Sequence, residues 1–151
     1  MDDPTARAEI VRDILATLPR WFGRPESTQA YIDEARAAGV ALLAARETAG
    51  RVVGFVTLRS EDDVTEIHAM GVVPDHHRSG IGRALIAAAA ERARASGTAA
   101  LTVKTLGPSH PDPGYAATRA FYSAMGFVPV AEFPDLWGPG TPCLVMTRPL
   151  A

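Results

Sequence analysis

Residues 64–86 read VTEIHAMGVVPDHHRSGIGRALI, and they predict a strand, a loop and a helix in direct succession. Apolar residues alternate from Val64 to Val73, which is the period of a half-buried strand. Pro74 ends this pattern, because proline cannot donate to a sheet ladder. The loop 77–82, HRSGIG, opens directly into a helix-forming run from Arg83. We expect the other elements of the chain to be arranged around this unit.

The loop has the properties of an anion site. Gly80 and Gly82 lack Cβ atoms, so a ligand can approach their backbone closely. The first N–H groups of the helix have no internal partner and lie at its positive end, which suits a phosphate or pyrophosphate, with Arg78 and Arg83 beside it. A turn that needs glycine only for packing gives the same pattern. A nucleoside-triphosphate loop would end in Gly-Lys-Ser/Thr, and a dinucleotide loop would have a small residue at Leu85.

Two motifs follow one another in the chain. A strand end, Val72-Val73-Pro74, precedes the loop 77–82, and Phe121-Tyr122 with Gly126-Phe127 lies downstream. Together they resemble the signatures of the GCN5-related N-acetyltransferase (GNAT) superfamily, whose coenzyme A motif is Arg/Gln-x-x-Gly-x-Gly/Ala. His77 stands in the Arg/Gln place. The resemblance implies an enzyme that transfers acetyl from acetyl-coenzyme A (acetyl-CoA) to an amine. It implies that the co-substrate contacts His77, Arg78, Ser79, Gly80, Ile81, Gly82 and Arg83.

Composition predicts one globular domain over 1–151. The chain is 47% apolar and 21% charged, with a net charge of −2 that argues against nucleic acid as a partner. No apolar run approaches the roughly 20 residues that span a bilayer, and the acidic N-terminus lacks a signal-peptide core, so we expect no membrane partner and a cytoplasmic protein. The single Cys143 lies in an apolar run, and we interpret it as a core residue.

The pattern of elements predicts an α/β fold. Helices are expected from about Pro4 to Pro19, 25–38, 80–95 and 115–125, and strands over 40–46, 52–59, 64–73, 99–106, 127–133 and 142–148. Short connections make the first three strands antiparallel, and a right-handed crossover makes 99–106 parallel to 64–73. The resemblance implies the GNAT fold, a mixed and mostly antiparallel sheet of about six strands flanked by four helices. The family's first strand is expected to be missing, because only two residues precede the first helix signal.

The resemblance also implies how the thioester is held. Pantetheine is a chain of amides that can pair with a strand edge as an added strand. By motif matching, the pairing groups are the backbones of Met70, Gly71 and Val72. Their amides would also polarise the thioester carbonyl as its oxygen gains charge. Arg119 is a candidate for the coenzyme phosphates, although a solvated helix face explains it equally well.

Proton transfer needs a base and an acid. Glu66 and His68 lie on one face of a strand, because side chains alternate. Glu66 falls where histone-type members of the superfamily carry their general base, and His68 is the alternative base or relay. An exposed strand residue is the plain interpretation of Glu66, and a water chain is a further alternative. The resemblance implies that Tyr122 protonates the departing thiolate, with Phe121 as its core partner.

The candidate residues for the acceptor pocket are aromatic. The loop after the first helix often borders the acceptor pocket in this superfamily, so Trp21 and Phe22 are candidate lining residues, together with Trp137. We expect a small-molecule amine, with a protein lysine or N-terminus as the first alternative. A non-catalytic acyl-CoA sensing module is the second. His76, His77 and His110 lack the companions of a metal site, so none is expected. Exposed closing strands of the superfamily often pair two chains, so a homodimer is expected.

Overall fold

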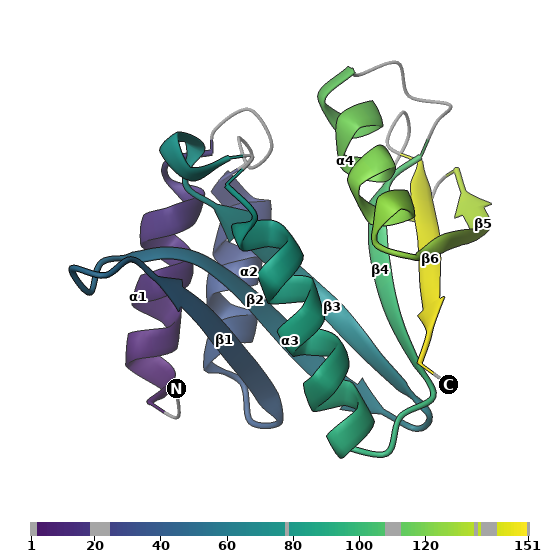
Figure 1. Ribbon diagram of the computed structural model, residues 1–151, viewed down its shortest axis with the longest axis horizontal. Coiled ribbons are helices and arrows are strands. Elements are labelled where there is room, and N and C mark those ends of the chain that lie inside the picture. Colours follow the sequence, from purple (N-terminus) through teal and green to yellow (C-terminus); the bar gives the residue numbers. More distant parts are fainter. Residues whose placement is uncertain are drawn as a thin grey trace.

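A computed structural model describes residues 3–18, 25–77, 79–107, 113–134, 136 and 142–150 of the chain. Two helices come first, and three strands, a short 3-10 helix, a third helix, a fourth strand, a fourth helix and two closing strands follow (Figure 1). In chain order these elements are α1 (Pro4–Leu15), α2 (Pro25–Arg36), β1 (Val40–Arg46), β2 (Val52–Glu61), β3 (Val64–Val72), η1 (Pro74–His76), α3 (Ile81–Ala95), β4 (Ala100–Leu106), α4 (Pro113–Ala124), β5 (Val128–Phe133) and β6 (Cys143–Pro149). The predicted elements are confirmed, with ends that shift by up to four residues.

The six strands form one sheet in the order β1-β2-β3-β4-β6-β5. Every neighbouring pair is antiparallel except β3 and β4, which are parallel because α3 crosses between them. The mixed, mostly antiparallel sheet with four helices is therefore confirmed. No helix in the described part of the chain is both long and apolar enough to span a membrane.

The sheet splits between β3 and β4. The two strands pair only over residues 64–67 and 100–103, and Figure 1 shows them diverging toward the end at which α3 begins. We call this divergence the split. Beyond Ile67 and Val103, the edge of β3 that faces β4 has no registered strand partner among the described residues.

Helices cover the two faces of the sheet in different ways. On one face, α3 and α4 pack on a buried cluster that includes Ile86, Leu101 and Phe127. On the opposite face, α1 and α2 pack on a second cluster that includes Leu15 and Phe55. We call these the α3–α4 face and the α1–α2 face. Burying such side chains contributes about 1.5–3 kcal/mol each, so both clusters hold the walls of the split in place.

A buried arginine joins α1 to α2. Arg7 is 7% exposed, and its Nε donates to the carbonyl oxygen of Ala35 at 2.7 Å. A second guanidinium nitrogen donates to the carbonyl oxygen of Ala37 at 3.4 Å. These carbonyls lie at the end of α2, where backbone acceptors lack helical partners. Arg7 therefore fixes the end of α2 relative to α1.

A β-bulge changes the facing of β3 near the split. Leu58 pairs with Ile67 and Thr57 pairs with Ala69, which leaves His68 as the extra residue. Ile67 packs on the α3–α4 face, whereas Ala69 packs on the α1–α2 face. The Thr57 hydroxyl accepts a hydrogen bond from the Ala69 N–H at 3.1 Å, so the bulge is closed by a side chain. Bulges commonly redirect side chains beside active sites.

The outer strand β5 exposes apolar side chains. Val128, Val130 and Phe133 are 54%, 64% and 46% exposed. The expected homodimer stays a prediction.

Candidate active site

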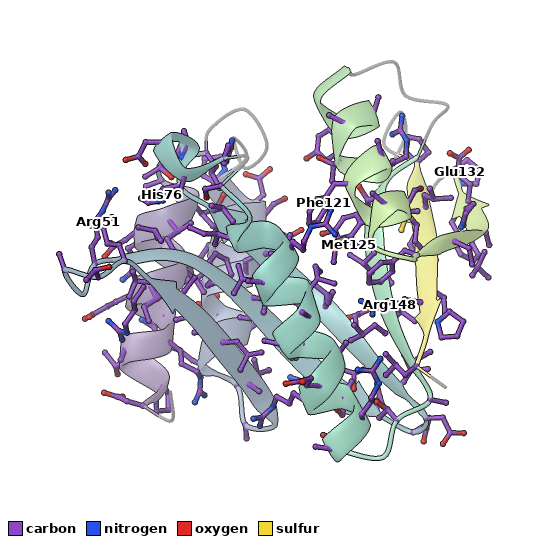
Figure 2. The ribbon with its side chains drawn as sticks, viewed as in Figure 1. Arg51, His76, Phe121, Met125, Glu132 and Arg148 are labelled. Carbon is purple, nitrogen blue, oxygen red and sulfur yellow. The ribbon has the colours of Figure 1, made fainter. Side chains whose placement is uncertain are left out.

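The loop before α3 has the geometry of the predicted anion site. Gly80 precedes the helix with φ +87°, a backbone conformation that side chains disfavour, and a Cβ placed there would meet nothing within 4 Å. The space at Gly80 is therefore open to a ligand. A Cβ at Gly82 would lie 3.2 Å from the Phe121 ring. Figure 2 shows Phe121 and Met125 pointing from α4 toward α3. The two sequence motifs thus meet in space through Gly82 and Phe121.

The loop is anchored on both sides. The His76 Nε2 lies 3.1 Å from a Glu47 carboxylate oxygen, and Arg51 lies 3.5 Å from Asp75. Figure 2 shows Arg51 and His76 at the β1–β2 side of the loop. The imidazole of His77 donates from Nε2 to the Val72 carbonyl oxygen at 2.7 Å, because a carbonyl only accepts. His77 therefore links the loop to the end of β3.

The register of β2 and β3 decides which backbone groups of β3 point into the split. The Val73 N–H donates to the Val53 carbonyl, so these two residues form a hydrogen-bonded pair. Pairs alternate along an antiparallel ladder, which makes Phe55 and Gly71 hydrogen-bonded as well. The N–H and C=O groups of Met70 and Val72 therefore point toward the split, whereas those of Gly71 point toward β2.

Charged side chains meet on the α1–α2 face of the split. The Lys104 Nζ, from β4, lies 3.1 Å from the Glu66 Oε2, from β3. The His68 Nδ1 lies 3.8 Å from the Glu66 Oε1, too long for a hydrogen bond. The Tyr31 ring, from α2, packs edge-on against His68 with ring centres 5.4 Å apart. We call Tyr31, Glu66, His68 and Lys104 the polar cluster.

The polar cluster keeps Glu66 ionised. The adjacent His68 and the Lys104 ammonium lower the pKa of Glu66 and outweigh the opposite effect of its partial burial. The Glu66 side chain is 31% exposed, so a ligand can still reach it. A carboxylate with a lowered pKa binds a cation well but accepts a proton less readily.

Tyr122, on α4, is buried in the cluster of the α3–α4 face and is 6% exposed. Its ring packs edge-on against Phe121 and Phe127, with centres 5.4 Å apart in each pair. Burial, and then the nearby Tyr31 phenol, raise the pKa of Tyr122. The hydroxyl therefore keeps its proton near neutral pH, as a proton donor must.

The structure places the other predicted site residues as follows. Ile81 and Gly82 are half-buried in the first turn of α3, and Arg83 and Ser79 are exposed beside it. Arg119 is half-buried on α4. Arg78, Trp21, Phe22 and Trp137 lie outside the described residues, as does His110.

Two members of the polar cluster were missed by sequence reasoning. Tyr31 was assigned only to a helix, and Lys104 only to a strand. One signal was available, because Lys104 is the single lysine in a chain with fourteen arginines. The buried interpretation of Cys143 is confirmed, since it is 0% exposed. Among the residues that the structure describes, no three His, Cys, Asp or Glu side chains gather as metal ligands.

Comparison with known proteins decides the family. The sequence profile of the acetyltransferase (GNAT) family matches residues 8–127. The chain belongs to this family. No curated protein is significantly similar to this GNAT acetyltransferase in sequence.

Solved structures agree with this assignment. A candidate GNAT acetyltransferase from Desulfovibrio desulfuricans is 25% identical with a TM-score of 0.79, over 95% of this chain and 92% of that one. An aminoglycoside 6'-N-acetyltransferase complexed with coenzyme A is 17% identical with a TM-score of 0.75, over 95% and 91%. The ribosomal-protein-S18-alanine N-acetyltransferase from Escherichia coli is 19% identical with a TM-score of 0.75, over 97% and 90%. The last two show the shared fold alone.

The chain is therefore an acetyl-CoA-dependent N-acyltransferase, as the sequence motifs predict. The open space at Gly80 and the open edge of β3 fit a phosphate and a pantetheine chain, respectively.

Proposed function

We propose that this GNAT acetyltransferase moves the acetyl group of acetyl-CoA to a primary amine of a small molecule, by direct attack within a ternary complex. The observation that carries the proposal is the Glu66 carboxylate, held ionised at the split on the face opposite α3. A carboxylate in this position attracts an ammonium group, which most primary amines carry near neutral pH.

In this proposal the coenzyme and the acceptor bind on different faces of the split. The phosphates lie at Gly80, and pantetheine runs along the edge of β3 through the N–H and C=O groups of Met70 and Val72. His77 already holds the Val72 carbonyl, so at that residue the N–H is the group that remains. The acceptor then enters from the α1–α2 face, where Glu66, His68 and Tyr31 lie.

The chemical step is a balanced acyl transfer. The acetyl thioester supplies an electrophilic carbonyl carbon. The lone pair of the neutral amine forms the new C–N bond, and the C–S bond breaks. The bound ammonium loses one proton to solvent before the attack, and the proton that the nitrogen loses on C–N bond formation goes to His68 or Glu66, directly or through water. Tyr122 gives its proton to the departing sulfur, and the protonated base and the tyrosinate then exchange protons with solvent. No acyl-enzyme is needed, and Cys143 is buried away from such a role.

A small acceptor is proposed on the polar character of the cluster and on the aromatic residues Trp21, Phe22 and Trp137, which are predicted from the sequence to lie at the acceptor pocket. Aminoglycoside acetyltransferases among the structural neighbours act on small amines, which is consistent with this choice. An acetyltransferase for a ribosomal-protein alanine shares the fold as well. The test must therefore distinguish a small amine from a protein N-terminus or lysine as the acceptor.

The test is thiol release from acetyl-CoA across a panel of amino acids, polyamines, aminoglycosides and short peptides, with background hydrolysis subtracted. We expect a small amine to give thiol and an acetylated product of matching mass. Coenzyme binding without release on any small amine, but with release on peptides, would contradict the proposal.

A matched pair of variants tests the role of Glu66. Glu66→Gln should raise the KM for the amine at least about tenfold, because the ion contact with the ammonium is lost. Glu61→Gln makes the same change at an exposed position at the end of β2 and should leave the KM unchanged. Equal KM values for both variants would show that Glu66 does not bind the acceptor.

A further inference from the structure

Lys104 gives the acceptor side of the split a positive charge. It is the only lysine of the chain, and its side chain is 44% exposed although its ammonium contacts Glu66 at 3.1 Å. Partly exposed ion pairs of this kind contribute only about 0–1 kcal/mol, so a ligand can exchange with them at little cost. The ammonium has three N–H donors, and Glu66 uses one of them.

The charges of Glu66 and Lys104 balance. Glu66 contributes one negative charge and Lys104 one positive charge, and the two side chains are in contact. An acceptor with several positive charges would be attracted by Glu66 and repelled by Lys104 a few ångströms away. A neutral pair of opposite charges instead fits a ligand that carries the opposite pair.

We propose that the acceptor is an amine that also carries a carboxylate within a few bonds of its nitrogen, as an amino acid does, and that Lys104 binds this carboxylate. The inference rests on the proposed function and names its substrate class. The ammonium of the acceptor lies on Glu66, and its carboxylate lies on Lys104. Each charge of the ligand then has an opposite charge of the protein beside it.

The two carboxylate oxygens of Glu66 have different neighbours. Among the residues that the structure describes, Oε2 contacts Lys104, whereas Oε1 lies 3.8 Å from the His68 Nδ1, beyond hydrogen-bond distance. An ammonium can therefore approach Oε1 while Lys104 keeps Oε2. His68 lies beside this position and can receive the proton that the amine loses.

The first experiment compares an amino acid with its carboxamide as acceptors, which differ in the charge of one group and hardly in shape. The quantity measured is the ratio of kcat/KM for the acid to that for the amide. Lys104→Met should lower this ratio at least about tenfold relative to the wild type, equivalent to about 1.4 kcal/mol. Comparing ratios cancels the different basicities of the two amines.

The control is Arg92→Met, which removes a cation from an exposed position on α3, on the other face of the sheet. It should leave the ratio at the wild-type value. An unchanged ratio in Lys104→Met, with turnover of both acceptors intact, would overturn the inference and leave the proposed function standing.

A second readout does not depend on turnover. Reductive methylation with ¹³C-formaldehyde keeps the charge of Lys104, and in this chain it labels only that side chain and the N-terminal amine. The amino acid should shift the Lys104 signal, and the carboxamide should shift it far less. Equal shifts, or none, would overturn the inference. If the acid shifts the signal but no small amine is acetylated, the proposed function fails while the carboxylate site stands.

Discussion

The two faces of the split present different chemical groups. The α3–α4 face presents backbone and apolar side chains, with Gly80 and Gly82 at the start of α3 and Phe121 against them. The α1–α2 face presents the polar cluster, whose members come from α2, β3 and β4. In the proposed function the first face binds the coenzyme through backbone groups, which suits a ligand common to a whole family. The second face depends on individual side chains, so it can differ between relatives that share the fold.

The two faces also keep a proton donor and an anion in different environments. Tyr122 belongs to the apolar side, where burial raises its pKa, whereas Glu66 belongs to the polar side, where His68 and Lys104 lower its pKa. One environment therefore preserves a proton donor and the other preserves an anion.

The largest expected effect is at Tyr122. Tyr122→Phe removes the proposed proton donor but keeps the ring that packs on Phe127. We expect kcat to fall about 100-fold or more, with coenzyme affinity unchanged, in steady-state kinetics and calorimetry. A variant with wild-type kcat would show that Tyr122 does not donate the proton.

Thr57 tests the bulge that redirects β3. Thr57→Val keeps the shape of the side chain but removes the hydroxyl that accepts from the Ala69 N–H. Because this N–H is buried, its loss of a partner should lower the free energy of unfolding by about 1–3 kcal/mol. Urea denaturation measures this change. An equally stable variant would show that the hydroxyl does not hold the bulge.

Gly80 and Gly97 form a matched pair at the two ends of α3. Their φ values are +87° and +78°, and a Cβ at either would meet nothing within 4 Å. Changing each to alanine should lower the free energy of unfolding by a similar amount, about 1–2 kcal/mol. Only Gly80→Ala should also weaken coenzyme A binding, by about tenfold, since its Cβ enters the proposed phosphate site.

Calorimetric titration with coenzyme A separates the two variants. Equal affinities would place the phosphates elsewhere than at the start of α3.

The smallest effect is a shift in the titration of Glu66. Its lowered pKa means that its ion contacts stabilise the fold above the pKa of the unfolded chain, and that this contribution is lost as the pH falls through the folded value. Lys104→Met removes one of the two groups that lower the pKa of Glu66, so the midpoint of the Glu66 titration should move to higher pH. Carboxyl ¹³C NMR across acidic pH measures it. A midpoint that stays in place would show that Lys104 does not act on Glu66.

The fold was predictable because its signals are local. The strand over 40–46 was predicted to the residue, since Gly39 precedes it and a glycine turn follows. The alternation of apolar residues predicted β3, and the glycines of the loop 77–82 predicted the start of α3. The bulge was not predictable, because the alternation of exposure continues through His68 while the facing of the strand changes.

The two faces of the split also differ in how far the sequence predicts them. The coenzyme side was predictable as a hypothesis, because its motifs are short and contiguous. The polar cluster was only half predictable, since Tyr31 and Lys104 lie far along the chain from Glu66 and His68. Only the register of β3 with β4 and the packing of α2 bring the four residues together.

Amide hydrogen exchange with and without coenzyme A shows whether the open edge of β3 binds the coenzyme. Binding should slow exchange at Met70 and Val72, whose N–H groups point into the split. Gly71 lies between them and already pairs with β2, so its exchange should change little. Equal effects at all three residues, or no effect at Met70 and Val72 under saturation, would show that the coenzyme does not pair with this edge.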